Sequence, residues 1–507
     1  MKNSSKTYDF VIIGSGIGGL VTALILAKNG FSVCVLEKNQ QLGGALQTFS
    51  RNKRIFDTGV HYLGGLDKGE NLYQLFSYLE ILDELQLKRL DDAFDYIRLA
   101  NGKTIPLGQG YEKYIQILSD IFPQETAAIH AFTEKIQEIC TYFPLYNIAT
   151  SAPKTYHTHP DILAISASDF IDGITKSQEL KAAFLGNGLL YAFDKNRTPL
   201  HVVALILNSY IKGSYRIENG GSQLTKALVK KIRHYNGELL KRKEVVKTIV
   251  NAEKKITQVV CQDGSSYQAT TFISNLHPVV TMDLVGKQHL MPATVQRIAS
   301  LKNSIASFVV NISLKEGVFP YHNSNYYDFF TPDAWETVEY DKNQWPQLLF
   351  SCTPPSSKSA TFADTFTSMT YIHWQEFEQW KQTHNSIVAP AERDASYQQF
   401  KNELAQKVVQ RLIERFPQLE NAIEEVHCST PLTFRDYLGN LEGEMYGIEK
   451  DFNNPIKTII NPKTKISNLY LTGQNIVFHG ILGATIGAFV TSFNFVDANK
   501  IINSIKE

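Results

Sequence analysis

Three glycines near the start of the chain have a spacing that lets the backbone contact a diphosphate. They are Gly14, Gly16 and Gly19, and an acidic residue, Glu37, follows them. Gly14 permits a tight turn, Gly16 lets backbone approach a pyrophosphate, and Gly19 lets a helix pack on a strand. A carboxylate in the place of Glu37 can bind both hydroxyls of a ribose and argues against a 2′-phosphate. These residues predict a site for FAD or NAD rather than NADP.

The segments around these residues supply the elements that such a site requires. Tyr8–Ile13 is predicted as a buried strand, Leu20–Lys28 as an apolar helix, and Phe31–Leu36 as a second strand that ends at Glu37. In this order of elements, the free N–H groups of the helix N-terminus face the phosphates. The pattern predicts an α/β fold that contains a Rossmann-type domain.

The residues after Glu37 favour FAD over NAD. Gly43 and Gly44 follow closely, and Asp57-Thr58-Gly59 comes soon after them. A glycine pair at this position lets backbone pass along an extended cofactor. FAD lying across the sheet is such a cofactor.

A matching element is predicted near the other end of the chain. Ile466–Leu471 is predicted as a strand that leads into Gly473 and Gln474. The following stretch, Ile476–Val496, is mostly apolar and has the length of a membrane span. Because it follows a Rossmann-type strand and contains His479, we interpret it as a buried helix beneath the cofactor.

The order of these motifs resembles the amine-oxidase and phytoene-desaturase superfamily of FAD enzymes. The finer resemblance is to the branch of carotenoid desaturases, carotenoid isomerases and all-trans-retinol 13,14-saturases. Phe56–Gly64 and Leu469–Gln474 look more like the retinol saturases than the phytoene desaturases. Gly220–Leu224 and Phe272–Pro278 are also similar to family motifs, so the resemblance covers both ends and the middle of the chain.

The resemblance implies a Rossmann-type FAD-binding domain interleaved with an α+β substrate domain. The FAD domain is expected to comprise residues 1–65, 215–281 and 455–507, and the substrate domain residues 66–214 and 282–454. The residues expected to bind FAD are Gly14, Gly16, Gly19, Glu37, Lys38, Gly43, Gly44, Val246, Gly473, Gln474 and Gly483. Val246 is assigned a backbone contact to the adenine. Gln474 stands where many members have an Asp, so its contact would be a neutral hydrogen bond.

The resemblance also implies the chemistry, which is the saturation, isomerisation or desaturation of conjugated C=C bonds in an apolar polyene or isoprenoid. The 24 Tyr and 29 Phe of the chain suit an apolar tunnel over the flavin, although such residues also build ordinary cores. Saturation and desaturation move a hydride at one carbon and a proton at its neighbour. His61, Tyr62 and His479 are the candidate proton donors or acceptors.

The composition and the absence of certain motifs indicate which partners to expect. Fifty basic and fifty acidic residues give no net charge, so nucleic acid is not an expected partner. Five scattered cysteines without a CxxC pair fit a reducing cytoplasm and predict no metal site. With no second GxGxxG motif and no signal-peptide core, we expect an external electron donor or acceptor and a cytoplasmic protein, at most peripheral at a membrane.

Three alternatives share the fold or the cofactor. The first is a flavin amine oxidase, which would release hydrogen peroxide from amines, or a protoporphyrinogen-oxidase-like enzyme. A module like the Rab GDP-dissociation inhibitors would bind prenylated proteins without FAD. A flavin-dependent sugar mutase would need arginines around a nucleotide-sugar site, and the sequence neither places nor excludes them.

Overall fold

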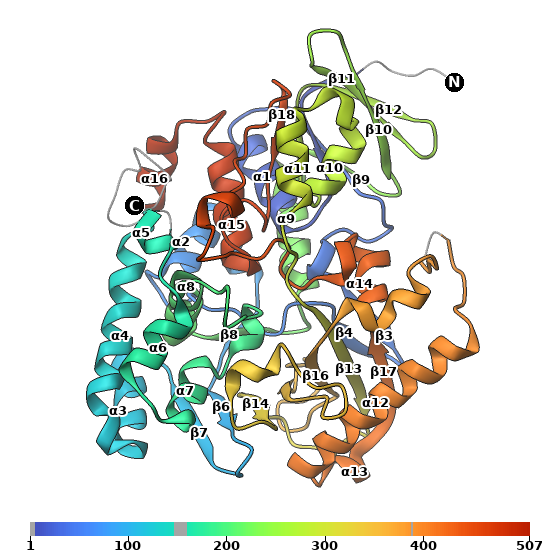
Figure 1. Cartoon of the computed structure of the whole chain (residues 1–507). Helices are drawn as coiled ribbons and strands as arrows, with labels where there is room; N and C mark the ends of the chain where they lie inside the picture. The colour runs from blue at the N-terminus through green and yellow to red at the C-terminus, as the bar shows by residue number, and fades with distance from the viewer. Residues whose placement is uncertain (1–5, 145, 147–159, 387–388, 507) are drawn as a thin grey trace.

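The computed structural model describes residues 6–144, 146, 160–386 and 389–506 (Figure 1). Its first sheet has a parallel core whose strands come from distant segments of the chain. In spatial order the parallel strands are β18 (Leu469–Leu471), β12 (Ser266–Ser274), β1 (Thr7–Ile13), β2 (Val33–Leu36) and β9 (Glu238–Leu240). A hairpin of β10 (Val245–Val250) and β11 (Ile256–Cys261) extends this sheet from the first half of β12.

The register of the parallel strands aligns their carboxyl ends. Ile13 pairs with both Leu36 and Ser274, and Ser274 pairs in turn with Leu471. The residues that follow these strands therefore meet at one edge of the sheet, which is where ligands of open α/β sheets bind.

A second sheet lies beside the first and is mostly antiparallel. Only its β14–β6 pair is parallel. In spatial order its strands are β17 (Ile423–Ser429), β13 (Ala306–Leu314), β16 (Thr365–Ile372), β15 (Leu348–Cys352), β14 (Asn325–Phe329), β6 (Ala93–Arg98) and β7 (Thr104–Gly108). All residues of β13 are buried, which makes this strand the centre of the second core.

Helices cover both sheets (Figure 1). On the parallel sheet, α1 (Ile17–Lys28) packs against α9 (Ser222–His234) and α15 (Gly480–Ser492). The other helices of eight or more residues are α2 (Asn71–Tyr78), α3 (Tyr111–Ile121), α4 (Thr126–Thr141), α6 (Ala167–Ile174), α7 (Gln178–Leu185), α8 (Leu200–Ile211), α10 (Pro278–Val285), α11 (Pro292–Ala299), α12 (Ala395–Arg415), α14 (Pro431–Leu438) and α16 (Ala498–Lys506).

The chain alternates between the two sheets, as an interleaved architecture requires. The first sheet uses residues 7–36, 238–274 and 469–471, and the second uses residues 93–108 and 306–429. The limits given above for the two domains remain predictions. The apolar C-terminal stretch forms the 13-residue helix α15, and no helix within the described ranges has both the length and the apolar character needed to cross a membrane.

Candidate cofactor and active site

A cleft of about 1340 Å³ opens at the carboxyl edge of the parallel sheet. The predicted cofactor residues that line it are Gly14, Gly16, Glu37, Lys38, Gly44, Gly473 and Gln474. It is also lined by Gly18, Lys243, Val245, Asn275, Glu444 and the end of α14, none of which was predicted to bind cofactor. The fold thus brings residues from three remote parts of the chain to one site.

Glu37 is buried at the end of β2 and is fixed by three hydrogen bonds. Ser15 donates to its Oε2 from the backbone N (3.1 Å) and from Oγ (2.6 Å), and the backbone N of Asn39 donates to Oε1 (2.8 Å). Oε2 thus accepts two of these bonds, whereas Oε1 accepts one and keeps a free lone pair. The side chain is therefore held ready to accept a hydrogen bond from a ribose hydroxyl through Oε1.

The N-terminus of α1 is available to an anion. Gly16 is its N-cap residue, no side chain caps the helix, and the first turn contains no acid. The glycines also allow close backbone contacts, because a Cβ on Gly44 would lie 3.0 Å from Gly16 Cα and one on Gly19 would lie 2.2 Å from Gly14 O. An uncapped helix terminus beside a buried carboxylate fits the diphosphate and ribose of FAD.

Four predicted cofactor residues are not among the residues that line the cleft. Gly19 and Gly43 serve packing, since a Cβ on Gly43 would lie 2.3 Å from Thr225 Oγ1. Gly483 packs under the backbone of Phe478 at the start of α15. Val246 is 48% exposed, and its neighbour Val245 lines the cleft, so the backbone contact of Val246 to the adenine stays a prediction.

An aromatic cavity of about 900 Å³ adjoins the inner end of the cleft. The two share Ala45, Leu438, Asn440, Glu444 and Met445 as lining residues. Most of the cavity wall is apolar or aromatic, with Leu189, Leu190, Tyr210, Val309, Phe350, Met369, Phe434, Tyr446 and Ile481. A molecule in this cavity can reach the inner end of the dinucleotide cleft.

Two of the three predicted catalytic residues, His61 and Tyr62, line the aromatic cavity. Burial lowers the pKa of His61 to about 4, so its imidazole is neutral at pH 7, and no described residue hydrogen-bonds its Nδ1. His479 instead lines a smaller neighbouring cavity, with its ring 4.5 Å from that of Tyr446. The structure thus separates His479 from the other two side chains.

Tyr62 is the outer member of a buried hydrogen-bond network. Its hydroxyl donates to Asp95 Oδ2 (3.0 Å) and lies 2.7 Å from the hydroxyl of Tyr327, which also lines the cavity. Behind them, Asn325 donates to Asp95 Oδ1 (2.8 Å), and the fully buried Arg216 donates to Asn325 Oδ1 (2.6 Å). Burial raises the pKa of Tyr62 well above 10. Tyr62 is therefore a positioned hydroxyl group and a poor acid.

Two sequence motifs more than 150 residues apart join beside this network. The backbone N of Gly221 donates to Asp57 Oδ1 (2.7 Å), and a Cβ on Gly220 would lie 2.5 Å from the same oxygen. Burial raises the pKa of Asp57 to about 7. The bond anchors the turn from which the chain continues to His61 and Tyr62.

Glu444 is a candidate that the sequence analysis missed. Glu444 is only 2% exposed and lines both the cleft and the aromatic cavity. Its Oε2 has no hydrogen-bond partner among the described residues. Burial raises its pKa well above the ordinary value. Burial thus favours the protonated form of Glu444 at the junction of the two cavities, and the one hint of it in the sequence is an acid next to Gly443.

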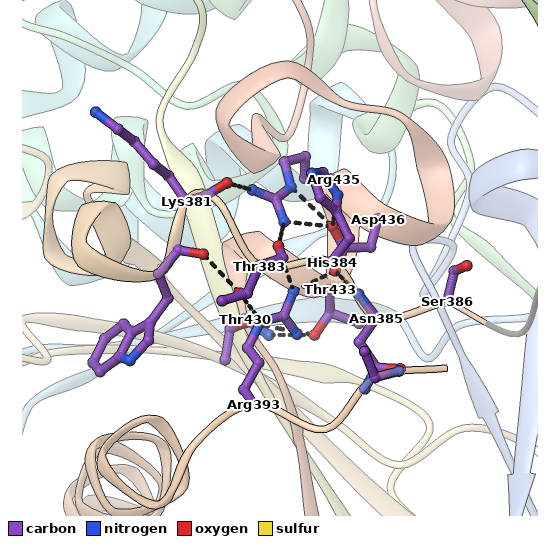
Figure 2. Close-up of polar contacts among 12 residues, drawn as sticks. Lys381, Thr383, His384, Asn385, Ser386, Arg393, Thr430, Thr433, Arg435 and Asp436 are labelled. Atoms are coloured by element: carbon purple, nitrogen blue, oxygen red, sulfur yellow. Dashed lines mark hydrogen bonds and ion pairs between the residues drawn. The ribbon is translucent and has the colours of Figure 1, made fainter. Parts of the chain in front are cut away.

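The wall of the cleft formed by α14 is anchored by a buried charge cluster (Figure 2). Asp436 is paired with Arg393 and with Arg435, whose Nη2 lies 2.6 Å from Oδ1, and it accepts a bond from the backbone N of Asn385 (2.9 Å). The carbonyl of Asp436 also accepts a bond from Lys38 Nζ (3.2 Å). The cluster thus fixes the residues after Asp436, which line the cleft.

Replacing Asp436 with Asn should lower the free energy of unfolding by about 3 kcal/mol, because it leaves the buried Arg393 without its counter-charge. Urea unfolding measures this change. Glu378→Gln breaks the exposed pair with Lys381 and should change stability by less than about 0.5 kcal/mol. Equal midpoints for the two variants would contradict the anchoring role of Asp436.

Comparisons with known proteins agree with this geometry. Residues 12–79 match the family model of the NAD(P)-binding Rossmann-like domain. The all-trans-retinol 13,14-reductase of Rattus norvegicus is 28% identical over 97% of this chain and 86% of its own length. The chloroplastic prolycopene isomerase of Daucus carota is 24% identical over 93% of this chain and 77% of its own length. The chain is a homologue of these enzymes.

These homologues confirm the resemblance to the retinol saturases and carotenoid isomerases, and with it the prediction of an oxidoreductase or isomerase. A further homologue, from Danio rerio, is 26% identical over 96% of this chain and 86% of its own length, and is named an inactive all-trans-retinol 13,14-reductase. Among solved structures, a putrescine oxidase bound to putrescine matches 98% of this chain and 99% of its own with a TM-score of 0.64 at 15% identity. That similarity confirms the predicted fold class.

Proposed function

We propose that the protein is an FAD-dependent oxidoreductase that acts on conjugated C=C bonds of an apolar polyene. The observation that carries this proposal is the junction of the dinucleotide cleft with the aromatic cavity, where the two share five lining residues. The cavity wall offers aromatic rings and few charges, so it selects a ligand by shape and length. A retinoid or carotenoid is a ligand of this kind.

The cleft suits FAD because it offers a buried carboxylate and an uncapped helix terminus. We propose that Glu37 binds the ribose, the N-terminus of α1 binds the diphosphate, and Gly473 and Gln474 lie along the rest of the cofactor. Bound FAD supplies the hydride chemistry. The protein's own residues position the polyene, exclude water and hold the proton.

Among the three reactions, the site favours saturation. Adding hydrogen across a C=C bond requires a proton at one carbon for each hydride at its neighbour, so a group that is still protonated at pH 7 must face the substrate. We propose Glu444 for this role, because burial favours its protonated form, whereas His61 is neutral and the proton of Tyr62 is bonded to Asp95. Isomerisation and desaturation remain the alternatives that the experiment below separates.

The test is incubation of the protein, with FAD reduced anaerobically, with all-trans-retinol and with lycopene isomers. A product heavier by two hydrogens is the expected result. An unchanged mass at a new retention time would establish an isomerase, and loss of two hydrogens with oxidised enzyme would establish a desaturase. No change with any polyene would overturn the proposed substrate class.

The same preparation tests the other functions. Hydrogen peroxide formed from putrescine or from another amine would favour an amine oxidase, and peroxide formed from a porphyrinogen would favour a protoporphyrinogen-oxidase-like enzyme. A colourless protein that takes up no FAD would favour a prenyl-binding module. We further propose that an external electron donor or acceptor serves the enzyme, that the protein is cytoplasmic, and that any contact with a membrane is peripheral.

Replacing Glu37 with Ala should weaken FAD binding by about 1.5–3 kcal/mol, because it removes charge-assisted hydrogen bonds to the ribose. Flavin fluorescence during titration of the apoprotein measures the dissociation constant. Glu253→Ala, in the exposed turn between β10 and β11, is the matched control and should bind FAD normally. Unchanged FAD affinity in the Glu37 variant would refute its assignment.

A further inference from the structure

A third cavity, of about 880 Å³, contains an amine with no acidic partner among the described residues. It is lined mainly by apolar side chains, including Phe143, Leu163, Ile476 and Val490. The amine is that of Lys450, whose Nζ donates to the carbonyl of Thr458 at 3.3 Å. One weak bond to a neutral oxygen leaves most of the donor capacity of an ammonium group unused.

The acids next to Lys450 in the sequence are bound by other cations. Glu449 pairs with Arg197 at 2.9 Å, and Asp451 pairs with the same guanidinium at 3.3 Å. Asp451 also accepts bonds from the backbone N and the side chain of Asn453 (2.9 and 3.0 Å). Burial lowers the pKa of Lys450 to about 8, whereas a nearby carboxylate would raise it.

His201 provides a second polar group without a partner in this cavity. It lies on α8, is 4% exposed, and has an Nδ1 that no described residue hydrogen-bonds. Its ring stacks on Phe143 with centroids 5.5 Å apart. Burial and the charge of Lys450 lower the pKa of His201 to about 3, so the two groups together carry one positive charge.

The cavity is linked to the proposed active site through shared lining residues. It shares Tyr146 and Phe478 with a cavity of about 530 Å³, which in turn shares Leu190, Tyr210, Gly480 and Ile481 with the aromatic cavity. The walls between the junction at Glu444 and Lys450 are thus largely apolar. A long apolar molecule with its reacting bonds near the cleft would extend its other end toward the amine.

We propose that Lys450 and His201 bind the carboxylate end of an apolar chain acid. One ammonium group matches the single charge of a carboxylate, and the neutral imidazole can hydrogen-bond its second oxygen. The proposal that such an acid binds here depends only on the residues of this cavity. Its identity as the substrate, a polyene acid rather than an unsubstituted polyene, rests on the proposed function.

The experiment compares all-trans-retinoic acid with all-trans-retinol, which share one chain and differ at the end group. Quenching of tryptophan fluorescence in the FAD-loaded protein gives both dissociation constants. The acid should bind at least about tenfold more tightly than the alcohol, because its end group adds a charge-assisted bond. Lys450→Met should abolish this preference and leave retinol binding within about threefold of the wild type, and Lys450→Arg should retain most of the preference.

The matched control is Lys457→Met, an exposed lysine near the cavity, which should keep the preference for the acid. Lys450→Met should also raise the melting temperature, since it removes an unpaired charge from an apolar site. Equal binding of acid and alcohol by the wild type, failure of both to bind, or equal weakening of both by Lys450→Met would overturn the proposal. Turnover measured on the same samples separates acid binding from the proposed function. A preference for the acid that depends on Lys450, without turnover of acid or alcohol, would refute the proposed function and leave the acid-binding site standing.

Discussion

Replacing Glu444 with Gln should lower the rate of C=C saturation by about 100- to 10,000-fold, the usual contribution of a general acid. Glutamine keeps the size of the side chain at the junction of the two cavities but has no acidic proton to give. Retention of FAD should not change, so the loss should fall on kcat. Single-turnover measurement of the product two hydrogens heavier gives this rate directly.

The matched control is Glu442→Gln, because Glu442 lies two residues away and is exposed. It should leave the rate within about threefold of the wild type, as expected for an exposed side chain that contacts neither cavity. Infrared difference spectra offer a readout independent of turnover, since a protonated carboxyl band should be present in the wild type and absent in Glu444→Gln. Full saturation activity in Glu444→Gln would move the search for the proton donor to Tyr62 and His61.

The burial of Glu444 should also make the free energy of unfolding depend on pH. Its pKa is 4.5 in its ordinary state and well above that in the folded protein. Between these two values only the folded protein holds the proton, so the free energy of unfolding falls as the pH rises. Glu444→Gln should remove this part of the pH dependence, which urea unfolding of both proteins at pH 5 to 8 would detect.

Replacing Gly18 with Ala should prevent stable FAD binding and lower the free energy of unfolding by about 3 kcal/mol. A Cβ on Gly18 would lie 2.5 Å from Gly473 Cα and 2.8 Å from Gly473 N. These atoms are backbone, and Gly473 has a φ of +94°, so neither side of the contact can move cheaply. The substitution should therefore force α1 away from the C-terminal element that lines the cleft.

Flavin absorbance after gel filtration and urea unfolding test this prediction. Gly173→Ala, in α6, is the control, because a Cβ there meets nothing within 4 Å and no left-handed φ is involved. It should leave FAD bound and change stability by at most about 1 kcal/mol, in the stabilising direction. A Gly18→Ala protein that binds FAD and unfolds like the wild type would show that the two elements are not in tight contact.

Local geometry explains why some predicted cofactor residues do not line the cleft. Side chains alternate across a strand, so on β10 Val246 is exposed while Val245 lines the cleft, and the backbone contact assigned to Val246 stays a prediction. Gly483 does not line the cleft for a different reason. The glycine lies in a helix, as predicted, and the structure uses it for close contact with Phe478.

The sequence by itself determined the dinucleotide half of this protein. Strand, glycine turn, helix and acid are neighbours along the chain, so Gly14, Gly16 and Glu37 take their relative positions from local backbone geometry. The motifs at Asp57, Gly220 and Gly473 could be recognised for the same reason. Their resemblance to a family supplied the cofactor and the class of substrate.

Only the tertiary structure decided which polar side chains serve the chemistry. Glu442 and Glu444 look alike in the sequence, yet one is exposed and the other is buried between two cavities. Lys450 stands out only because its neighbouring acids are bound by Arg197 and because the walls around it come from distant segments. The protonation and availability of a side chain depend on burial and on partners that the fold brings from elsewhere in the chain, and local sequence does not specify these.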